Sequence, residues 1–279
     1  MRQGICSRAG VAWITIGWAA ACAEPAPTCR PEATSRAIVG GTVDTAYPEV
    51  VLVQKGDGST CSGVVVGARV VLTASHCVRG AAVSSLVVRT GSTDTPAGAL
   101  LALEEIAIYP GATGTDTDLS GGVDLGAVLL VEDAPVRPAV LELSPLGADM
   151  NGQEVTLVGF GRDAEGGSQV RRSVTVRVKT ACPRLLRAGE SGATACTGDS
   201  GGAVLRDNKV IAIVSHGVQG CTGPSYHTRL DVHRAWIESV LAHEESAPCT
   251  TCVGPDEGCP ALPQDAGNTE CYAQPLSPE

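Results

Sequence analysis

The sequence predicts an all-β protein that ends in a single helix. Short apolar or alternating runs recur along most of the chain between clusters of Gly, Asp, Thr and Ser, which is the pattern of short strands joined by turns. The composition agrees: 34 Gly and 17 Pro favour turns, and three Trp, four Tyr and one Phe leave the core to Val, Leu, Ile and Ala. Many short strands at this spacing indicate a sandwich or a barrel.

The elements can be assigned in order along the chain. The expected strands cover residues 50–53, 63–66, 70–73, 86–89, 125–131, 155–160, 170–178 and 210–215. A helix is expected over residues 233–242, with Asp231 as its N-cap, because Trp236, Ile237 and Val240 recur on one face.

The N-terminus is typical of an export signal over residues 1–22. Arg2 and Arg8 precede an uncharged stretch that is too short to span a bilayer and that ends in small residues. Cleavage on either side of Cys22 and a lipoprotein-type cut, which would leave Cys22 as an acylated membrane anchor, both remain open. Cysteine parity favours the second, because loss of Cys6 and lipidation of Cys22 leave ten of the twelve cysteines.

Two further segments flank the strand-rich region. Residues 23–37 form an expected linker or propeptide that contains three prolines. Residues 244–279 form an expected acidic tail with seven acids, no Lys or Arg, several prolines and four cysteines. The tail is expected to be pinned by disulfides, because its one Cys-x-x-Cys pair lacks the second pair of a zinc site.

The net charge and the cysteine content limit the classes of partner and the compartment that the sequence allows. The net charge of −10 argues against nucleic acid or an anionic membrane as the main partner, since both attract cationic surfaces. Twelve cysteines indicate an oxidising compartment, so the protein is expected to be secreted or in the cell envelope. The sequence shows no cluster of metal ligands and implies no cofactor.

Three short motifs contain the residues suited to chemistry. His76 follows an apolar strand in residues 72–77, Asp124 ends a glycine-containing loop, and Ser200 lies in the run Gly-Asp-Ser-Gly-Gly. Taken singly, each is more often structural than catalytic. Glycines on both sides of a serine, however, let a substrate carbonyl approach and free a backbone N–H for an oxyanion.

Together with Ile-Val-Gly-Gly at residues 38–41, these motifs closely resemble the chymotrypsin-like (trypsin-fold) serine endopeptidases, and we assign the chain to their secreted bacterial type. The order His, Asp, Ser is itself diagnostic among serine hydrolases. The resemblance covers residues 38–243, the expected protease domain. It implies two Greek-key antiparallel β-barrels and a C-terminal helix.

The resemblance also implies catalytic roles. Ser200 would be the nucleophile and His76 its general base, later the acid that protonates the leaving amine. Asp124 would fix the tautomer of His76 and stabilise the imidazolium. The N–H groups of Gly198 and Ser200 would bind the oxyanion.

Substrate-binding residues follow from the same resemblance. Ser215, His216 and Gly217 would form the edge that binds an extended substrate backbone, with His216 in place of the usual aromatic residue. Thr194 would form the floor of the primary pocket, and Ser225 would narrow its interior. This predicts cleavage after uncharged, small to medium side chains, unless Glu190 turned into the pocket and restored a basic preference.

Disulfides and activation complete the expectations. The resemblance implies the bridges Cys61–Cys77 and Cys196–Cys221, and leaves Cys182 to pair with Cys29 or a tail cysteine. A cut before Ile38 would free an α-amino group that pairs with Asp199. Because residue 37 is Ala, that cut needs a protease that accepts small residues, or trimming after a cut at residue 36.

The sequence thus predicts a monomeric secreted endopeptidase, made as a zymogen, that cleaves protein or peptide substrates through an acyl-enzyme. Two alternatives belong to other classes. One is a catalytically silent binding protein on a protease fold, which the presence of all three motif residues disfavours. The other is a non-proteolytic serine hydrolase such as an esterase, which the missing strand–turn–helix context around Ser200 disfavours.

Overall fold

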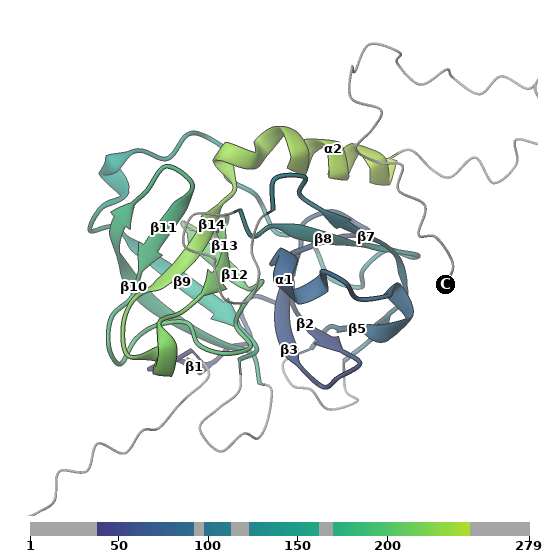
Figure 1. The fold of residues 1–279 in the computed structure, drawn as a ribbon, viewed down its shortest axis with the longest axis horizontal. Coiled ribbons are helices and arrows are strands. Elements are labelled where there is room, and N and C mark those ends of the chain that lie inside the picture. Colours follow the sequence, from purple (N-terminus) through teal and green to yellow (C-terminus); the bar gives the residue numbers. More distant parts are fainter. Residues whose placement is uncertain (1–37, 92–97, 113–122, 162–169, 246–279) are drawn as a thin grey trace, which may run out of the picture. The chain divides into compact units, whose positions relative to one another are not determined.

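The computed structural model describes residues 38–91, 98–112, 123–161 and 170–245. These residues form two antiparallel β-barrels and a C-terminal helix, which confirms the expected fold (Figure 1). The expected signal peptide at residues 1–22, the linker at 23–37 and the tail beyond residue 245 lie outside the described residues. Within the described part, no helix is long and apolar enough to cross a membrane.

The N-terminal barrel is one seven-stranded sheet with the strand order β6-β5-β2-β3-β4-β8-β7. Its strands are β2 (Val50–Lys55), β3 (Thr60–Val65), β4 (Val70–Thr73), β5 (Leu86–Arg89), β6 (Leu100–Leu101), β7 (Leu103–Ile108) and β8 (Gly126–Leu130).

The C-terminal barrel has the strand order β1-β10-β11-β14-β13-β12-β9. Strand β9 pairs with both β10 and β12, so β9 to β14 form a closed ring and β1 adds to its outside through β10. The strands are β1 (Thr42–Val43), β9 (Glu154–Gly159), β10 (Arg172–Ala181), β11 (Leu185–Ala188), β12 (Ala203–Arg206), β13 (Lys209–His216) and β14 (Ser225–Arg229).

The helices differ from the expectation in two ways. A four-residue helix, α1 (Ser75–Val78), follows β4, and it was not expected. The long helix is α2 (Arg234–Glu245), preceded by the 3₁₀ turn η4 (Asp231–His233); further 3₁₀ turns are η1 (Val83–Ser85), η2 (Ala148–Met150) and η3 (Gln219–Cys221). Asp231 is not an N-cap, because its carboxylate binds Arg229 and the N–H of Leu146 instead.

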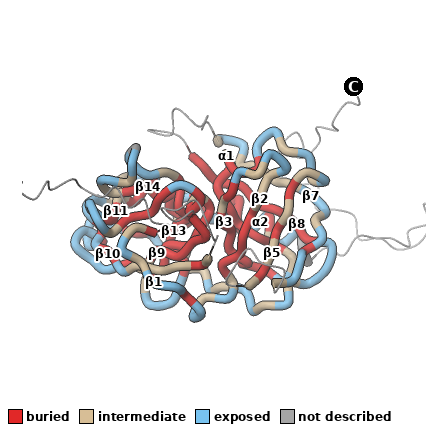
Figure 2. Tube along the Cα trace, turned by 90° about the horizontal axis from the view of Figure 1, so that it is seen from below, coloured by how far each residue is buried: buried red, intermediate tan, exposed pale blue. Residues whose placement is uncertain are grey.

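Three apolar clusters explain why many strands are apolar on both faces. Val51 and Val53 of β2 point into the N-terminal barrel, whereas Val50 and Leu52 of the same strand join a cluster that also contains residues of the C-terminal barrel and α2. A third cluster fills the C-terminal barrel. The strands where the two barrels meet are therefore buried over most of their length (Figure 2), and the site lies between the barrels there.

Candidate active site

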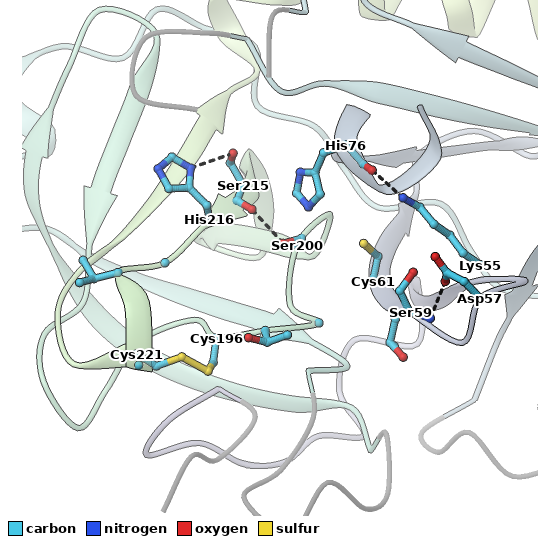
Figure 3. A pocket seen from close by; sticks show the side chains of 16 residues that line it. Lys55, Asp57, Ser59, Cys61, His76, Cys196, Ser200, Ser215, His216 and Cys221 are labelled. Carbon is cyan, nitrogen blue, oxygen red and sulfur yellow. Dashed lines mark hydrogen bonds between the residues drawn. A yellow bond between two sulfur atoms is a disulfide. The ribbon is translucent and has the colours of Figure 1, made fainter. Parts of the chain in front are cut away.

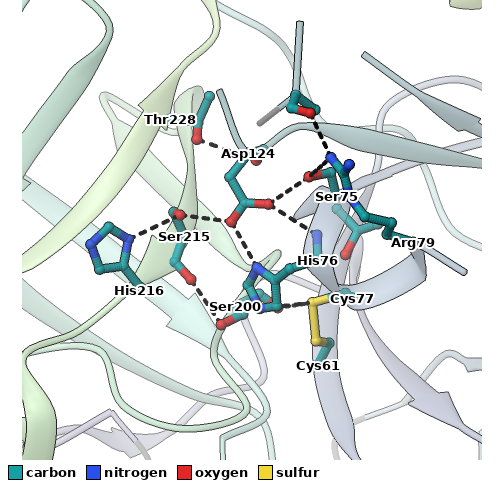
Figure 4. A network of polar contacts seen from close by, with 12 residues as sticks. Cys61, Ser75, His76, Cys77, Arg79, Asp124, Ser200, Ser215, His216 and Thr228 are labelled. Atoms are coloured by element: carbon teal, nitrogen blue, oxygen red, sulfur yellow. Dashed lines mark hydrogen bonds and ion pairs between the residues drawn. A yellow bond between two sulfur atoms is a disulfide. The ribbon is translucent and has the colours of Figure 1, made fainter. Parts of the chain in front are cut away.

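The strand register of the N-terminal barrel brings His76 and Asp124 together. Thr73 of β4 pairs with Gly126 of β8, so α1, which follows β4, lies beside the residues that precede β8. The Nδ1 of His76 lies 2.7 Å from Oδ2 of Asp124, and the backbone N–H of His76 donates to Oδ1 at 3.0 Å (Figure 4). One carboxylate thus holds His76 at two points, the imidazole and the backbone N–H.

Two hydroxyls hold the buried Asp124 carboxylate from other sides. Ser75 donates to Oδ1 at 2.8 Å and Ser215 donates to Oδ2 at 2.7 Å, while Thr228 donates to the Asp124 carbonyl at 3.2 Å. Burial alone would raise the pKa of Asp124. The hydrogen bonds from His76 and Ser215, together with the charge of His76, outweigh burial and hold that pKa well below its usual range.

Ser200 lies on a turn of the C-terminal barrel that is tied to β3 of the other barrel. The Ser62 N–H donates to the Ser200 carbonyl at 2.7 Å, and its hydroxyl donates to the Gly198 carbonyl at 3.0 Å. Gly198 has φ +93°, which favours glycine. Neither the Gly198 nor the Ser200 N–H donates to an acceptor among the described residues.

The Ser200 hydroxyl is bonded to the Ser215 carbonyl at 2.9 Å and makes no hydrogen bond to His76. The structure therefore joins Asp124 to His76 but leaves the serine turned towards β13. A rotation about the Ser200 side chain would be needed to direct its proton to the imidazole, and such bonds are often completed only when substrate binds.

A cavity of about 500 Å³ lies beside Ser200 between the two barrels (Figure 3). It is lined by Lys55, Asp57, Ser59, Thr60, Cys61 and His76 of the N-terminal barrel and by Cys196, Thr197, Gly198, Ser200, Ser215, His216, Gly217, Val218, Gly220 and Cys221 of the C-terminal barrel. An open cavity of this size beside a serine can hold several residues of an extended peptide.

Thr194 and Ser225, expected to shape the primary pocket, do not line this cavity. Both are fully buried, and the Thr194 hydroxyl donates to that of Ser225 at 3.1 Å. Behind them, Ser225 also contacts Nε2 of the buried His227 at 3.1 Å. Glu190 does not turn towards the cavity, because it pairs with Lys179 on the surface at 2.8 Å.

The edge that was expected to bind the substrate backbone lines the cavity. Ser215, His216 and Gly217 all contribute to the cavity. His216 stacks on Tyr226 with ring centroids 4.8 Å apart, and burial lowers its pKa. The His216 ring therefore lies parallel to the ring of Tyr226 in β14.

Two disulfides brace the cavity: Cys61 is joined to Cys77 and Cys196 is joined to Cys221. The Cys61 and Cys77 sulfurs lie close to the His76 ring, but the disulfide leaves them no thiolate with which to bind a metal ion. The half-buried Cys182 has no disulfide partner among the described residues, and Cys29 and the tail cysteines lie outside them.

A second buried carboxylate lies behind the serine turn. The fully buried Asp199 accepts bonds from three backbone N–H groups, those of Ile38 at 3.0 Å, Gly161 at 2.8 Å and Cys196 at 2.9 Å. Burial raises the pKa of Asp199 to about 6, although these bonds and the charge of Arg172 act against it. The structure thus brings Ile38 and Asp199 together, while the Ile38 nitrogen is still part of the chain.

Sequence reasoning missed two residues of this arrangement. Ser75 lies next to His76 and could have been noticed as an extra hydroxyl, but nothing in the sequence indicates that it faces Asp124. Ser62 gave no signal, because its role depends on the approach of the two barrels.

Two β-barrels with Ser, His and Asp gathered between them are the arrangement of the chymotrypsin-like serine proteases. Comparison with known proteins agrees, since the family model described as Trypsin matches residues 38–237. The chain belongs to this trypsin family and is a serine endopeptidase, which acts on protein or peptide substrates.

Individual relatives are insect proteins. The chain is 30% identical over 232 residues to the vitellin-degrading protease of Bombyx mori, covering 74% of this chain and 86% of that protein. It is 32% identical over 204 residues to achelase-1 of Lonomia achelous, with 64% and 95% covered. It is 26% identical over 235 residues to trypsin alpha of Drosophila erecta, with 72% and 86% covered.

These relatives bear on several expectations. The assignment to a bacterial type is not supported, because the relatives are eukaryotic. The lipid anchor at Cys22 and the monomeric state also find no support. The family membership disfavours a silent binding protein and a non-proteolytic hydrolase.

Proposed function

We propose that this endopeptidase cleaves peptide bonds with Ser200 as nucleophile, His76 as general base and Asp124 as the carboxylate that orients the histidine. The observation that carries the proposal is the Asp124–His76 contact of 2.7 Å at the edge of the cavity that Ser200 lines. A hydroxyl is inert at its own pKa, so a nucleophilic serine needs an adjacent base of this kind.

The proton moves in two steps. His76 Nε2 takes the Ser200 proton as Oγ attacks the scissile carbonyl, and it then gives that proton to the departing amine, leaving an acyl-enzyme. A water molecule repeats the sequence, and the acid product leaves with Ser200 reprotonated. The negative oxygen formed at each attack is bound by the N–H groups of Gly198 and Ser200, which have no competing acceptor among the described residues.

The specificity we propose is for uncharged side chains of small to medium size before the cleaved bond. The serine side of the cavity includes Thr197, Gly217 and the Cys196–Cys221 disulfide, and none of its lining residues carries a carboxylate. Asp57, the one acid that lines the cavity, belongs to the other barrel. The side chains of Thr194 and Ser225 are buried behind the cavity and are joined by a hydrogen bond of 3.1 Å. They occupy the space into which a deeper pocket would extend, which favours a shallow pocket.

Activation is proposed to occur by a cut between residues 37 and 38. Ile38 is fully buried with its nitrogen beside Asp199, but its φ of +35° is a strained conformation for a β-branched residue. A cut would relieve that strain and replace a neutral N–H by an ammonium group beside the buried acid. A pocket that accepts Ala would allow the enzyme to make this cut itself.

Secretion is part of the same proposal. The basic and apolar N-terminal segment and the twelve cysteines support export to an oxidising compartment. The two disulfides that brace the cavity need such an environment.

The test uses a fluorophosphonate, which phosphonylates active serines, together with a denatured protein substrate. The cleaved protein should be labelled once, at Ser200, and labelling should abolish cleavage of the substrate. A peptide series that varies only the residue before the scissile bond should show the highest kcat/KM for Ala or Val. Labelling at another serine would overturn the assigned nucleophile, and a strong preference for Arg would overturn the specificity.

A further inference from the structure

The inward-facing row of β10 ends in a charged residue. Val174, Val176 and Val178 alternate along this strand and pack in the interior of the C-terminal barrel. Arg172 continues the same alternation by one step, so its side chain leaves the strand on the inner face. Arg172 is half-buried, but its Nε is buried, and burying part of a charged group costs free energy unless it has a partner.

Strand pairing places this side chain on the face where Asp199 lies. Arg172 is directly opposite Gly159 of β9, and directly opposed residues of antiparallel strands point to the same face. A Cβ built on Gly159 would lie 2.5 Å from Oδ1 of Asp199. Gly159 therefore leaves the space that the carboxylate occupies, and Arg172 is the neighbouring side chain on that face.

The polar contacts of Arg172 agree with this placement. Its Nε is buried and has no hydrogen-bond acceptor among the described residues. Its positive charge acts on Asp199 and opposes the effect of burial on that carboxyl. By contrast, the adjacent Arg171 points to the other face, where it donates to Asp44 and to the carbonyls of Val50 and Gly91.

We propose that Arg172 is a second counter-ion for Asp199, which keeps the serine turn of the uncut chain partly competent for catalysis. The inference rests on the proposed activation, in which the amino group of Ile38 becomes the main partner of Asp199. Before the cut, Asp199 accepts only backbone N–H groups, and Arg172 provides the positive charge that holds it ionised in place. Since Asp199 lies between Gly198 and Ser200, holding it also holds the two N–H groups of the oxyanion hole.

The experiment labels a mixture of uncut and cut full-length protein with the fluorophosphonate. After reduction of the disulfides, intact-mass spectrometry separates the two species, so the rate of labelling is read for each one in the same tube. Uncut wild-type chain should be labelled at a measurable rate. Arg172→Gln should lower that rate at least tenfold in the uncut species and change it less than twofold in the cut species, while Arg172→Lys should retain most of it.

Arg177→Gln is the matched control. Arg177 lies on the same strand, but it is exposed and pairs with Glu154 at 2.7 Å, so its loss should leave both rates unchanged. Equal rates for uncut wild type and uncut Arg172→Gln would overturn the inference, as would an uncut wild-type chain that is never labelled beside a labelled cut chain. Failure to label the cut wild-type chain would instead reject the proposed function.

A second measurement, of stability at two pH values, tests the inference if Arg172→Gln folds too poorly for the labelling experiment. The uncut Arg172→Gln chain should lose more stability than wild type on moving from about pH 5 to about pH 8, because the ionised Asp199 then lacks its counter-ion. A destabilisation that is the same at both pH values would mean that Arg172 only fills space, and would overturn the inference.

Discussion

The two barrels each bury one carboxylate beside the cavity, and the two acids differ in how they are held. Asp124 is surrounded by side-chain donors from Ser75, His76 and Ser215, which lower its pKa despite burial. Asp199 is fully buried and receives three backbone N–H bonds, which do not offset burial, so its pKa rises to about 6. Similar depth thus gives opposite shifts, because the donors differ.

The difference separates a permanent part of the site from a conditional one. Asp124 and His76 lie on the N-terminal barrel, and the donors around Asp124, which include Ser215 of the other barrel, keep its carboxylate ionised and oriented without any change to the chain. Asp199 in the uncut chain is under-compensated, and an additional positive charge would change its state. In the proposed activation, the N-terminal barrel supplies a fixed base and the C-terminal barrel supplies a nucleophile on a turn that responds to the cut.

The largest effect expected is the loss of either reacting side chain. Ser200→Ala or His76→Ala should lower kcat on the order of 10⁵-fold, because nucleophile and base act as one unit. The double variant should be scarcely slower than either single variant, and all three should keep the same thermal unfolding midpoint. Losses that add in the double variant would show that the two residues do not act together.

The next effect compares the two acids directly. Asp124→Asn should lower kcat about 10⁴-fold with little change in KM, because the histidine is then held in the wrong tautomer. Asp199→Asn in the cut protein should lower kcat about 10²-fold, the cost of one poorly placed oxyanion donor, and should also raise KM. Equal losses with equal KM would contradict the division between a fixed base and a regulated turn.

The sequence predicted the features that depend on short contiguous motifs, such as most apolar strands and the three catalytic candidates. It missed the features that depend on contacts between segments far apart in the chain. The strand with sequence Ser-Tyr-His-Thr-Arg, β14, was not predicted, because Ser225, His227 and Thr228 are polar yet fully buried. Asp231 was assigned as a helix cap because it precedes an apolar row, but a tertiary contact with Arg229 takes its carboxylate. The register that places Arg172 opposite Gly159 is likewise invisible without strand pairing.

Stability as a function of pH should distinguish uncut from cut protein. In the uncut chain the folded-state pKa of Asp199, about 6, lies above its ordinary value of 3.8, so the folded state holds the proton more tightly than the unfolded state. The resulting stability is present below about pH 4 and is lost as pH rises through 6, a change of about 3 kcal/mol. A chain that begins at Ile38 should lack this loss, because its ammonium group favours the ionised acid.

Urea denaturation of both chains, each carrying Ser200→Ala to prevent self-digestion, measures this difference. Burial lowers the pKa of His227 to about 3 and that of His233 to about 4, so both histidines destabilise the fold as pH falls below about 6.5. Their effect is common to the two chains and cancels in the difference. Parallel stability curves between about pH 4 and pH 7 would show that the amino group does not pair with Asp199.

The smallest effect expected comes from removing one of the hydrogen-bond donors to the Asp124 carboxylate. Ser75→Ala removes the hydroxyl that donates to Oδ1 of Asp124 at 2.8 Å and leaves the His76 N–H and the Ser215 hydroxyl in place. His76 Nδ1 also stays at 2.7 Å, so three of the four donors are retained. We therefore expect kcat to fall about tenfold, in line with the loss of one hydrogen bond to a charged group, and KM not to change. Because a donor to the ionised form is lost, the pKa of Asp124 should rise.

Two control variants separate the loss of the Ser75 hydroxyl from a general effect of the substitution. Ser75→Thr restores a hydroxyl at the same position and should recover most of the rate, whereas a residue that only fills space would be replaced equally well by Ala. Ser239→Ala, a hydroxyl lost from the exposed face of α2, should change nothing. If Ser75→Ala is as active as wild type, the two contacts from His76 and the Ser215 hydroxyl suffice to hold Asp124, and the Ser75 hydroxyl is not needed to keep the base in place.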